Sequence, residues 1–522
     1  MYGKSLHLLD YIVIAISLLV SLGVGFYFAR KQTNTDHYFA GSRSIPTWVV
    51  GMSIMATLIS SVTFLAYPGE GFKSNWILLV QGLMVVIVLL GLVWFVVPLY
   101  RKVIGISAYE YFEKRFGFFA RMYSSLAFAF AHFTKMGTVF FLLALAITSM
   151  TGMNPYSLIW IVGIIIIIIA LLGGMEAIIW LDVFQGFLLI GGALLCLGLI
   201  LFIPPGGPAS IINTAMEHHK INFGPYAWDF TKLTFIVMAL NGIFYGIQKY
   251  ATDQTIVQRY LTAKSDKGAV KAALMGVLLS LPIWTLFMFI GTGLFAFYKV
   301  TGYTLPPHIN PDEVFPYFIM TQLPAGITGL VISALIAAAI SSLDSDLNCL
   351  AAVGVEDYYV RIKPNSTDRQ RLKMGRIIVL ISGILSLVIA SLYVVAGTTG
   401  VLEVVFGLYS IFSGGIAGIF LLGMFSTRAN KQGLYISIGV CILFTAWAVL
   451  TSTKWNGNLL LDFGKFSFHQ HKYMLGVYTH LIIIVVGYFA SLFFKSKEVD
   501  KDLTIYAWYD KLKKKDQKII IN

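Results

Sequence analysis

The stretch that decides the fold is Leu335-Ile-Ala-Ala-Ala-Ile-Ser-Ser-Leu-Asp-Ser-Asp-Leu-Asn348, an apolar run that carries two carboxylates and three hydroxyls between positions 341 and 346. Polar and ionisable groups are expensive inside a bilayer, so such a cluster indicates a path for an ion or a solute. Ala338, Ser341 and Ser342 share one face of a helix. One carbonyl and two hydroxyls form a neutral cage that a monovalent cation such as Na⁺ can enter and leave. The serines alone are also compatible with hydrogen bonds to the preceding turn or with close helix packing.

The composition around this stretch is that of a membrane protein. Hydrophobic residues make up 57% of the 522 positions, charged residues only 12%, and the mean hydropathy is +0.79. Apolar segments of about 20 residues, the length that spans a bilayer as a helix, recur along the chain. We therefore predict an all-α integral membrane protein with thirteen transmembrane helices, at 7–28, 45–72, 76–98, 120–150, 154–173, 181–204, 232–252, 270–299, 323–352, 375–397, 401–424, 433–452 and 474–494.

The net charge of +13 is distributed as expected for a membrane protein rather than for a nucleic-acid-binding protein. Most of the 38 Lys and Arg residues lie in alternate loops and in the C-terminal tail, all on one predicted side. Because basic loops stay in the cytoplasm, we expect a multi-pass protein of the inner (plasma) membrane with its N-terminus outside and its C-terminus inside. The basic residues predicted on the outer side are Lys4, Lys73, Lys220, Lys232, Lys299, Lys454, Lys465 and Lys472.

Two of the predicted spans have the pattern of broken helices. The second span carries Ser60, Ser61 and Thr63 at mid-depth, and the seventh carries Asn241-Gly-Ile-Phe-Tyr-Gly246. Irregular backbone at membrane depth survives only where protein or a water-filled cavity satisfies it. Because the two breaks are five spans apart, we predict two five-helix units related as an inverted repeat, with the solute held where the breaks meet. Glycine and hydroxyl residues in membrane helices also serve in packing.

This spacing divides the chain into six parts. Two of them are the predicted repeats, and the others are an N-terminal helix with its loop, an outer loop, two C-terminal helices and a basic cytoplasmic tail. In chain order the parts are 1–44, 45–204 (first repeat), 205–231 (outer loop), 232–425 (second repeat), 426–494 and 495–522.

Four motifs, in the right order, resemble the sodium:solute symporter family, which includes sodium/sugar, proline, iodide, vitamin and sialic acid cotransporters. The motifs are Asp36-His-Tyr-Phe-Ala-Gly-Ser-Arg43, Gly173-Gly-Met-Glu-Ala-Ile-Ile-Trp-Leu-Asp182-Val-Phe-Gln-Gly186, Thr252-Asp-Gln-Thr-Ile-Val-Gln-Arg259 and the segment Ala338 to Ser342. The resemblance covers residues 5–495. It implies a LeuT-type core on spans 2–11 and sodium-driven uptake of a small molecule by alternating access.

The resemblance also implies positions for the sodium ions. The first site would use the carbonyls of Ala56 and Ile59 on span two, and on span nine the Ala338 carbonyl with the hydroxyls of Ser341 and Ser342. Some family members have a second, inner sodium site. Its ligands align with Asp182, Ser341, Asp344 and Ser345, and Asp344 departs from the serine of those members. The extra carboxylate adds charge for a second sodium, and it is equally compatible with a proton or a basic partner.

Lys135 is the most informative residue for the solute, because it lies well inside span four, one turn after His132. A lysine at membrane depth is normally paired or functional. In the resemblance, Lys135 matches an arginine that contacts the carboxylate in sialic acid transporters, whereas Phe406 stands at a sugar-contacting glutamine of some sodium/sugar members. A sugar and a sugar acid both stay open. The full set of candidate solute-binding residues is Ser60, Thr63, Gln81, Lys135, Asn241, Tyr245 and Gln248.

Other classes of function fit the sequence less well. A channel would need symmetric pore rings or a short filter loop, and an enzyme would need a nucleophile with its base or a metal constellation. We therefore expect a sodium-coupled symporter, not an enzyme. Its partners would be a small-molecule substrate, co-transported Na⁺ and the lipid bilayer, without nucleic acid, and it would work as a monomer. Other organic acids, vitamins, amino acids or anions are the alternative solutes.

Overall fold

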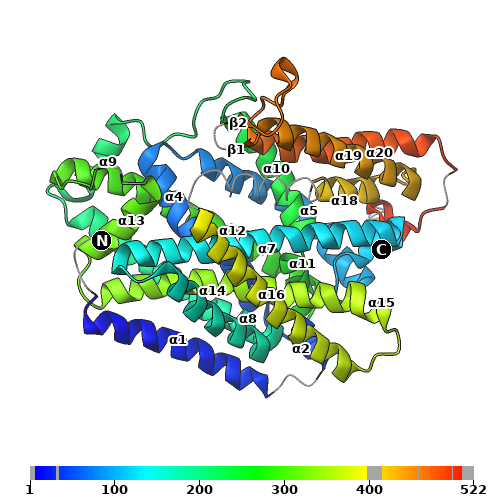
Figure 1. Cartoon of the computed structure of the whole chain (residues 1–522), viewed down its shortest axis with the longest axis horizontal. Helices are drawn as coiled ribbons and strands as arrows, with labels where there is room; N and C mark the ends of the chain where they lie inside the picture. The colour runs from blue at the N-terminus through cyan, green and yellow to red at the C-terminus, as the bar shows by residue number, and fades with distance from the viewer. Residues whose placement is uncertain are drawn as a thin grey trace, which may run out of the picture.

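The computed structural model describes residues 6–30, 34–307, 309–396, 414–455, 458–495 and 498–507. Within these ranges the long helices lie side by side along the longest dimension of the molecule (Figure 1). Helix α1 lies at one edge of this view, and α19 and α20 lie at the opposite edge. Nine of the described helices are long and apolar enough to cross a membrane, and the bent pair α3 and α4 makes a tenth.

The elements before residue 207 include most of the predicted first repeat. They are α1 (Leu8–Ala29), α2 (Thr35–Ala40), η1 (Gly41–Arg43), α3 (Thr47–Leu58), α4 (Ser61–Lys73), α5 (Ile77–Val103), α6 (Glu110–Phe116), α7 (Phe118–Thr151) and α8 (Pro155–Phe202).

The elements after residue 207 include those of the predicted second repeat, together with short helices in the outer loops. They are α9 (Gly207–Glu217), α10 (Phe235–Ala251), α11 (Gln254–Thr262), α12 (Asp266–Thr301), α13 (Pro311–Gln322), α14 (Ile327–Val353), η2 (Gly354–Tyr359), α15 (Val360–Ile362), α16 (Asp368–Ala396), α18 (Ile416–Phe425), α19 (Lys431–Ser452), β1 (Lys454–Trp455), β2 (Asn458–Leu459), η3 (Gly464–Phe466), α20 (Lys472–Leu492) and η4 (Lys501–Leu503).

The second predicted span is broken, as the sequence indicates. Helix α3 ends at Leu58, α4 begins at Ser61, and the two are bent by 57°. Between them, Ile59 has an extended backbone with φ −102° and ψ 113°. The last carbonyls of α3 therefore do not accept the hydrogen bonds that the next turn of a continuous helix would donate to them. Carbonyl oxygens become available in the middle of the protein.

The break predicted in the seventh span is wrong. Helix α10 runs without interruption from Phe235 to Ala251. Its glycines instead allow α5 to approach closely: a Cβ atom on Gly242 would lie 2.9 Å from the Cα of Gln81, and one on Gly246 would lie 3.2 Å from the Cα of Val85. Small residues let membrane helices pack backbone against backbone, and this packing explains the glycine pattern.

A sharp turn joins the fifth and sixth predicted spans inside α8. Gly174 has φ 57° and ψ −168°, a conformation that favours glycine. The predicted span 181–204 thus begins several residues too late. Asp182, which was expected to open that span, lies inside its helix and is fully buried.

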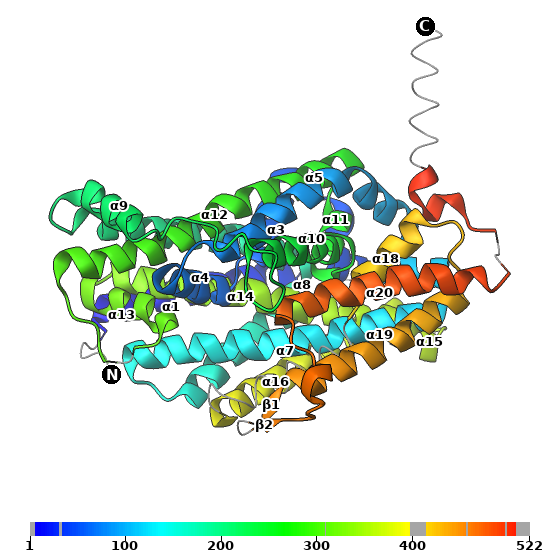
Figure 2. The same ribbon diagram turned by 90° about the horizontal axis from the view of Figure 1, so that it is seen from above.

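Helix α14, which carries the polar stretch between Leu335 and Asn348, forms the centre of the molecule. Every residue from Val331 to Val353 is buried, and α14 packs against α1, α7, α8 and α16. Figure 2 shows the same helices from above, with α14 inside the bundle. Because these positions are buried, the polar side chains of α14 need partners inside the bundle.

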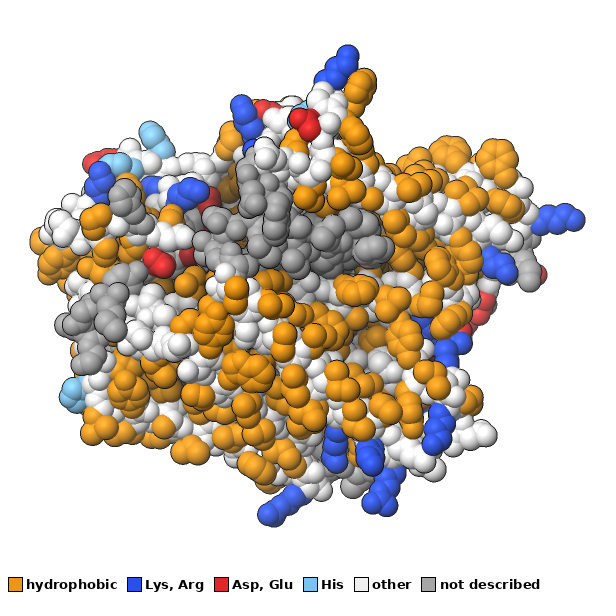
Figure 3. All heavy atoms as spheres, viewed as in Figure 1, with side chains coloured by type: hydrophobic (Ala, Val, Ile, Leu, Met, Phe, Trp, Pro, Cys, Tyr) orange, Lys and Arg blue, Asp and Glu red, His pale blue; other side chains and the backbone are white. Residues whose placement is uncertain are grey.

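Hydrophobic side chains cover most of the visible face of the molecule (Figure 3). A hollow of about 610 Å³ on the surface of α8 and α14, bordered by Phe187, Leu194 and Leu330, is lined by apolar residues, as contact with acyl chains requires. The number of thirteen spans stays a prediction. Helix α10 is only 17 residues long, and most of the predicted span 401–424, like residues 508–522 of the tail, lies outside the described residues.

Candidate functional site

A cavity of about 420 Å³ lies beside the break between α3 and α4. It is enclosed by α3, α4, α5, α7, α10 and α12, and six of the seven predicted solute-binding residues line it. The seventh, Asn241, lies one hydrogen bond away, because Gln81 Nε2 donates to Asn241 Oδ1 at 3.3 Å. The lining residues are Thr57, Leu58, Ser60, Val62, Thr63, Tyr67, Gln81, Gly82, Val85, Ala131, His132, Lys135, Tyr245, Gln248, Lys249, Asp253 and Trp284.

A chain of five charged or titratable side chains runs along one wall of this cavity. We call His132, Lys135, Lys249, Asp253 and Asp346 the cavity network. Lys135 Nζ lies 3.0 Å from Asp346, and His132 Nδ1 lies 2.8 Å from the same carboxylate. His132 Nε2 lies 3.5 Å from Asp253 Oδ2, to which Lys249 Nζ is 2.6 Å away. The network links α7, α10, α14 and the residue that caps α11.

The two ends of the Lys135 ion pair have different surroundings. The side chain of Lys135 is 30% exposed and lines the cavity, whereas Asp346 on α14 is 0% exposed and lies behind it. A lysine at membrane depth is normally paired or functional, and Asp346 is the paired carboxylate here. An ammonium group has three N–H donors, so the pair with Asp346 leaves donors free to face the cavity.

A second buried cluster surrounds Asp182. Its carboxylate accepts hydrogen bonds from Ser53 and, at 2.6 Å, from Ser341. Arg259 Nη2 lies 2.8 Å from Asp182 Oδ2, and both side chains are completely buried. Arg259 also donates to Ser345 Oγ at 2.7 Å. The residues predicted for a second sodium are thus brought together, with an arginine among them.

Asp344 completes this cluster and is the less satisfied of its two carboxylates. It is fully buried, and its Oδ2 has no hydrogen-bond partner among the described residues. Ser345 lies 3.5 Å from Asp344 Oδ1. Asp182 and Asp344 thus bring two carboxyl groups into a cluster whose one arginine, Arg259, is paired with Asp182.

The residues of the first predicted sodium site lie on two elements that contact each other, α3 and α14. Ala56 and Ile59 are at the broken end of α3, and the Ala56 carbonyl accepts only a short-range bond from Ile59 N at 3.2 Å. Ser342 Oγ is buried and has no hydrogen-bond partner among the described residues. A buried hydroxyl without a partner needs an explanation, and a bound cation provides one. Ser341 donates its proton to Asp182 and keeps its oxygen lone pairs for a cation.

Sequence reasoning missed several residues of these sites. Asp346 and Arg259 both stood in noted segments, but the helical pattern does not show that they reach Lys135 and Asp182 from 211 and 77 positions away. Asp253 and Trp284 were not considered as cavity residues. A signal was present for Asp346, because a carboxylate in an apolar helix requires a basic partner. Phe406 lies outside the described residues.

Comparison with known proteins identifies the family. The profile of the sodium:solute symporter family matches residues 38–440. The chain belongs to the sodium:solute symporter family. It is therefore a sodium-coupled solute transporter of the membrane and not an enzyme, as the four motifs predicted.

Relatives match this symporter over nearly its whole length. The sodium/sialic acid symporter NanT of Aliivibrio fischeri is 30% identical over 506 residues, which cover 96% of this chain and 97% of that protein. The sodium/sialic acid symporter SiaT of Proteus mirabilis is 31% identical, covering 95% and 97%. The human sodium/iodide cotransporter is 30% identical over 85% of this chain and 70% of its own length.

Solved structures confirm the fold. A Na⁺-coupled sialic acid symporter in a substrate-bound, outward-open state superposes with a TM-score of 0.86 at 30% identity, covering 96% of this chain and 100% of that one. The transporter Mhp1 in a closed conformation has a TM-score of 0.54 at 17% identity and shares the fold alone, covering 89% of this chain and 97% of its own. The predicted LeuT-type, all-helical membrane architecture is thus confirmed.

Proposed function

We propose that this symporter takes up a carboxylated sugar of the sialic acid type. The observation that carries the proposal is the position of Lys135, which lines the cavity with a side chain 30% exposed, while its ion-pair partner Asp346 is fully buried. A cation held in this way attracts an anionic group of the solute without leaving a buried carboxylate unpaired. Two relatives that match over nearly their full length carry sialic acid in their names.

The rest of the cavity suits the hydroxyl-rich part of such a solute. Hydroxyls of Ser60 and Thr63 and the amides of Gln81 and Gln248 offer donors and acceptors, and Tyr67, Tyr245 and Trp284 offer aromatic surface. A few placed polar groups among apolar ones fix a ligand's orientation. The volume of about 420 Å³ is of the size that encloses one small organic molecule.

The sodium that drives uptake would bind at the break. We assign it the carbonyls of Ala56, Ile59 and Ala338 and the hydroxyls of Ser341 and Ser342, because this set contains the unpartnered Ser342 hydroxyl and the carbonyl end of α3. Ser342→Ala removes one ligand. We expect it to raise the sodium concentration for half-maximal uptake several-fold at unchanged protein abundance. Ser333→Ala, on the same helix but bonded to Gly329 O, is the matched control.

A second sodium would bind beside Asp182, Ser341, Asp344 and Ser345. The unpartnered Oδ2 of Asp344 supports the assignment, since an ionised carboxylate buried beside Asp182 and a single arginine calls for one more cation. Asp344→Asn removes that charge and leaves the ion pair of Asp182 with Arg259 intact. The Hill coefficient for sodium should fall from near two towards one. A wild-type coefficient of one would leave a single coupled ion.

The orientation and the assembly state belong to the same proposal. The N-terminus is assigned to the outside and the C-terminus to the cytoplasm of the inner (plasma) membrane, because basic loops remain inside. Lys and Arg side chains gather mostly at the right and lower right of the view in Figure 3, which supports this assignment. The cavity lies within one chain, so the protein is proposed to work as a monomer.

A thermal-shift comparison tests the choice of solute. A ligand that binds only the folded protein raises its melting temperature. In saturating NaCl, sialic acid should raise the melting temperature, and its methyl ester, which has the same sugar but no carboxylate charge, should raise it much less. Equal shifts with both compounds would contradict the role of the carboxylate. A response confined to amino acids, vitamins or iodide would replace the sugar acid as the solute.

A further inference from the structure

His132 occupies the centre of the cavity network and touches two carboxylates. Its Nδ1 lies 2.8 Å from Asp346 Oδ1, and its Nε2 lies 3.5 Å from Asp253 Oδ2. A neutral imidazole has one N–H donor and one lone pair, whereas an imidazolium has two N–H donors. Ionised carboxylates only accept hydrogen bonds. A neutral His132 therefore satisfies one of its two neighbours, and the unequal distances fit this pattern.

The charges of the network balance when His132 is neutral and no solute is bound. Lys135 and Lys249 carry two positive charges, and Asp253 and Asp346 carry two negative charges. With a neutral His132 the sum is zero. An anion bound at Lys135 would bring the sum to −1 in surroundings where an uncompensated charge is costly. Protonation of His132 would restore neutrality and supply the second N–H donor that Asp253 lacks.

We propose that an anionic solute binds together with one proton, which His132 holds between Asp346 and Asp253. The inference rests on the proposed function, because it needs a carboxylate at Lys135. His132 lines the cavity, so the proton comes from the water that fills it and no bond of the solute changes. The proton is then a further ligand of the transporter beside sodium and the solute.

The other groups around His132 do not offer a better place for this proton. Phe128 stacks on its ring at 4.0 Å between centroids. Tyr109, Tyr245 and Cys349 interact with Asp253 or Asp346 and are neutral acids in the physiological range. Asp344 interacts with Asp346 from the same helix, on the side of the Asp182 cluster. Histidine is the side chain whose ordinary titration falls nearest to physiological pH.

Isothermal titration calorimetry in two buffers measures how many protons are taken up for each solute bound. Sialic acid is titrated into the full chain in saturating NaCl at pH 8, once in Tris and once in phosphate, two buffers with different enthalpies of deprotonation. The difference between the two binding enthalpies should correspond to about one proton taken up per solute. The solute carboxylate itself is ionised at pH 8 and at neutral pH, so it does not take up this proton. The apparent Kd should tighten as pH falls, by up to about tenfold per unit, because one proton is linked to binding.

Variants assign the proton to His132. His132→Gln should bring the proton number close to zero and flatten the pH dependence of Kd. The matched control is His480→Gln. His480 is a buried histidine of α20, its ring centroid lies 5.2 Å from that of Phe244, and it is remote from the network in sequence. This control variant should retain one proton per solute.

Two results would overturn this inference. One is binding of sialic acid by the wild type with equal enthalpies in both buffers, a measurement that does not depend on any variant folding. The other is an unchanged proton number in His132→Gln. Both leave the proposed function standing. Failure of every carboxylated sugar to bind would instead overturn the proposed function, and the proton linkage with it.

Discussion

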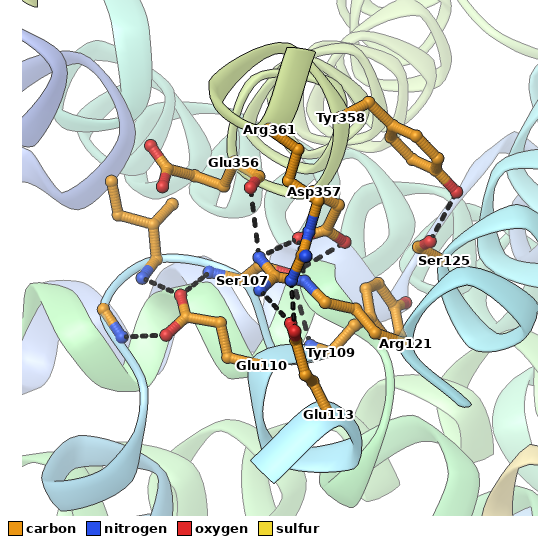
Figure 4. A network of polar contacts seen from close by, with 12 residues as sticks. Ser107, Tyr109, Glu110, Glu113, Arg121, Ser125, Glu356, Asp357, Tyr358 and Arg361 are labelled. Carbon is orange, nitrogen blue, oxygen red and sulfur yellow. Dashed lines mark hydrogen bonds and ion pairs between the residues drawn. The ribbon is translucent and has the colours of Figure 1, made fainter. Parts of the chain in front are cut away.

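Two ionic networks in this symporter look alike in composition and differ in how completely they are paired. The first is the cavity network. The second, which we call the loop network, consists of Glu113 on α6, Arg121 on α7, Asp357 on η2 and Arg361 on α15 (Figure 4). Arg121 Nε donates to Asp357 at 2.8 Å, Nη1 to Glu113 at 2.8 Å and Nη2 to the Glu356 carbonyl at 3.2 Å.

The surroundings of Arg121 leave none of its nitrogens unused. Ser107 completes the pairing by donating to Asp357 Oδ2 at 3.1 Å, and Arg361 bonds to Glu113. Figure 4 shows these side chains converging from separate segments. In the cavity network, by contrast, Lys135 and His132 line a cavity, and the contact of His132 with Asp253 is long, at 3.5 Å. A network whose donors and acceptors all have protein partners holds segments together. A network beside a cavity with donors or acceptors left over can bind a ligand.

Removal of Arg121 should give the largest effect, and the effect should be on stability. Arg121→Met leaves Asp357 buried and unpaired, which typically costs about 3–5 kcal/mol. We expect a clearly lower melting temperature and near-normal solute affinity in the fraction that stays folded. Replacing both partners, as Arg121→Met with Asp357→Leu, should recover part of the loss because no charge is then stranded. An unchanged melting temperature in the single variant would show that the loop network does not clamp these segments.

Removal of Lys135 should weaken solute binding, and some loss of stability is expected as well because Asp346 loses one of its two partners. Lys135→Met takes away the cation that would meet the solute carboxylate, a loss of about 2–5 kcal/mol for a buried charge pair, or roughly 30-fold or more in Kd. Affinity for the uncharged methyl ester should change little, and Lys135→Arg should restore much of the affinity for the acid. Isothermal titration in NaCl measures all three. Equal losses of affinity for the acid and the ester would show that Lys135 maintains the shape of the cavity and does not recognise the charge of the solute.

The smallest effect concerns pH and the loop network. Burial raises the pKa of Glu113, but hydrogen bonds from Arg361 and Arg121 outweigh it and hold that pKa below its ordinary value of 4.5. A carboxyl with a lowered pKa contributes stability above its ordinary value and loses it as pH falls through the folded-state value. Melting temperatures should therefore fall less steeply below pH 4.5 in Glu113→Gln than in the wild type. Glu217→Gln, an exposed residue of α9, should follow the wild type.

The sequence predicted the elements better than their contacts. Hydropathy located nearly all long helices, and the Ser60 to Thr63 pattern located the break in the second span. The same kind of reasoning failed at Gly242 and Gly246, because a glycine that frees the backbone and a glycine that admits a neighbouring helix look identical in one dimension. The predicted end of the fifth span at residue 173 lies next to the turn at Gly174, but the start of the sixth span was placed at 181, several residues too late.

The residues of the site could be predicted from the sequence, but the ion pairs and hydrogen bonds between them could not. Six of the seven solute candidates line the cavity, since polar residues at membrane depth are rare and few places can hold them. The partners of Lys135, His132 and Asp182 were not predicted, because Asp346, Asp253 and Arg259 approach from elements brought near only by packing. Pairing of buried charges depends on side-chain reach across helices, and helical periodicity alone does not encode it.

Solute uptake by the purified protein tests the central claim most directly. Proteoliposomes loaded with potassium buffer are diluted into radiolabelled sialic acid with either NaCl or KCl outside, and accumulated label is followed over time. We expect concentrative uptake only with the inward sodium gradient, competition by unlabelled sialic acid, much weaker competition by its methyl ester, and loss of uptake in Lys135→Met. Equal accumulation in NaCl and KCl, or sodium-driven uptake that sialic acid and its methyl ester inhibit equally, would contradict the claim.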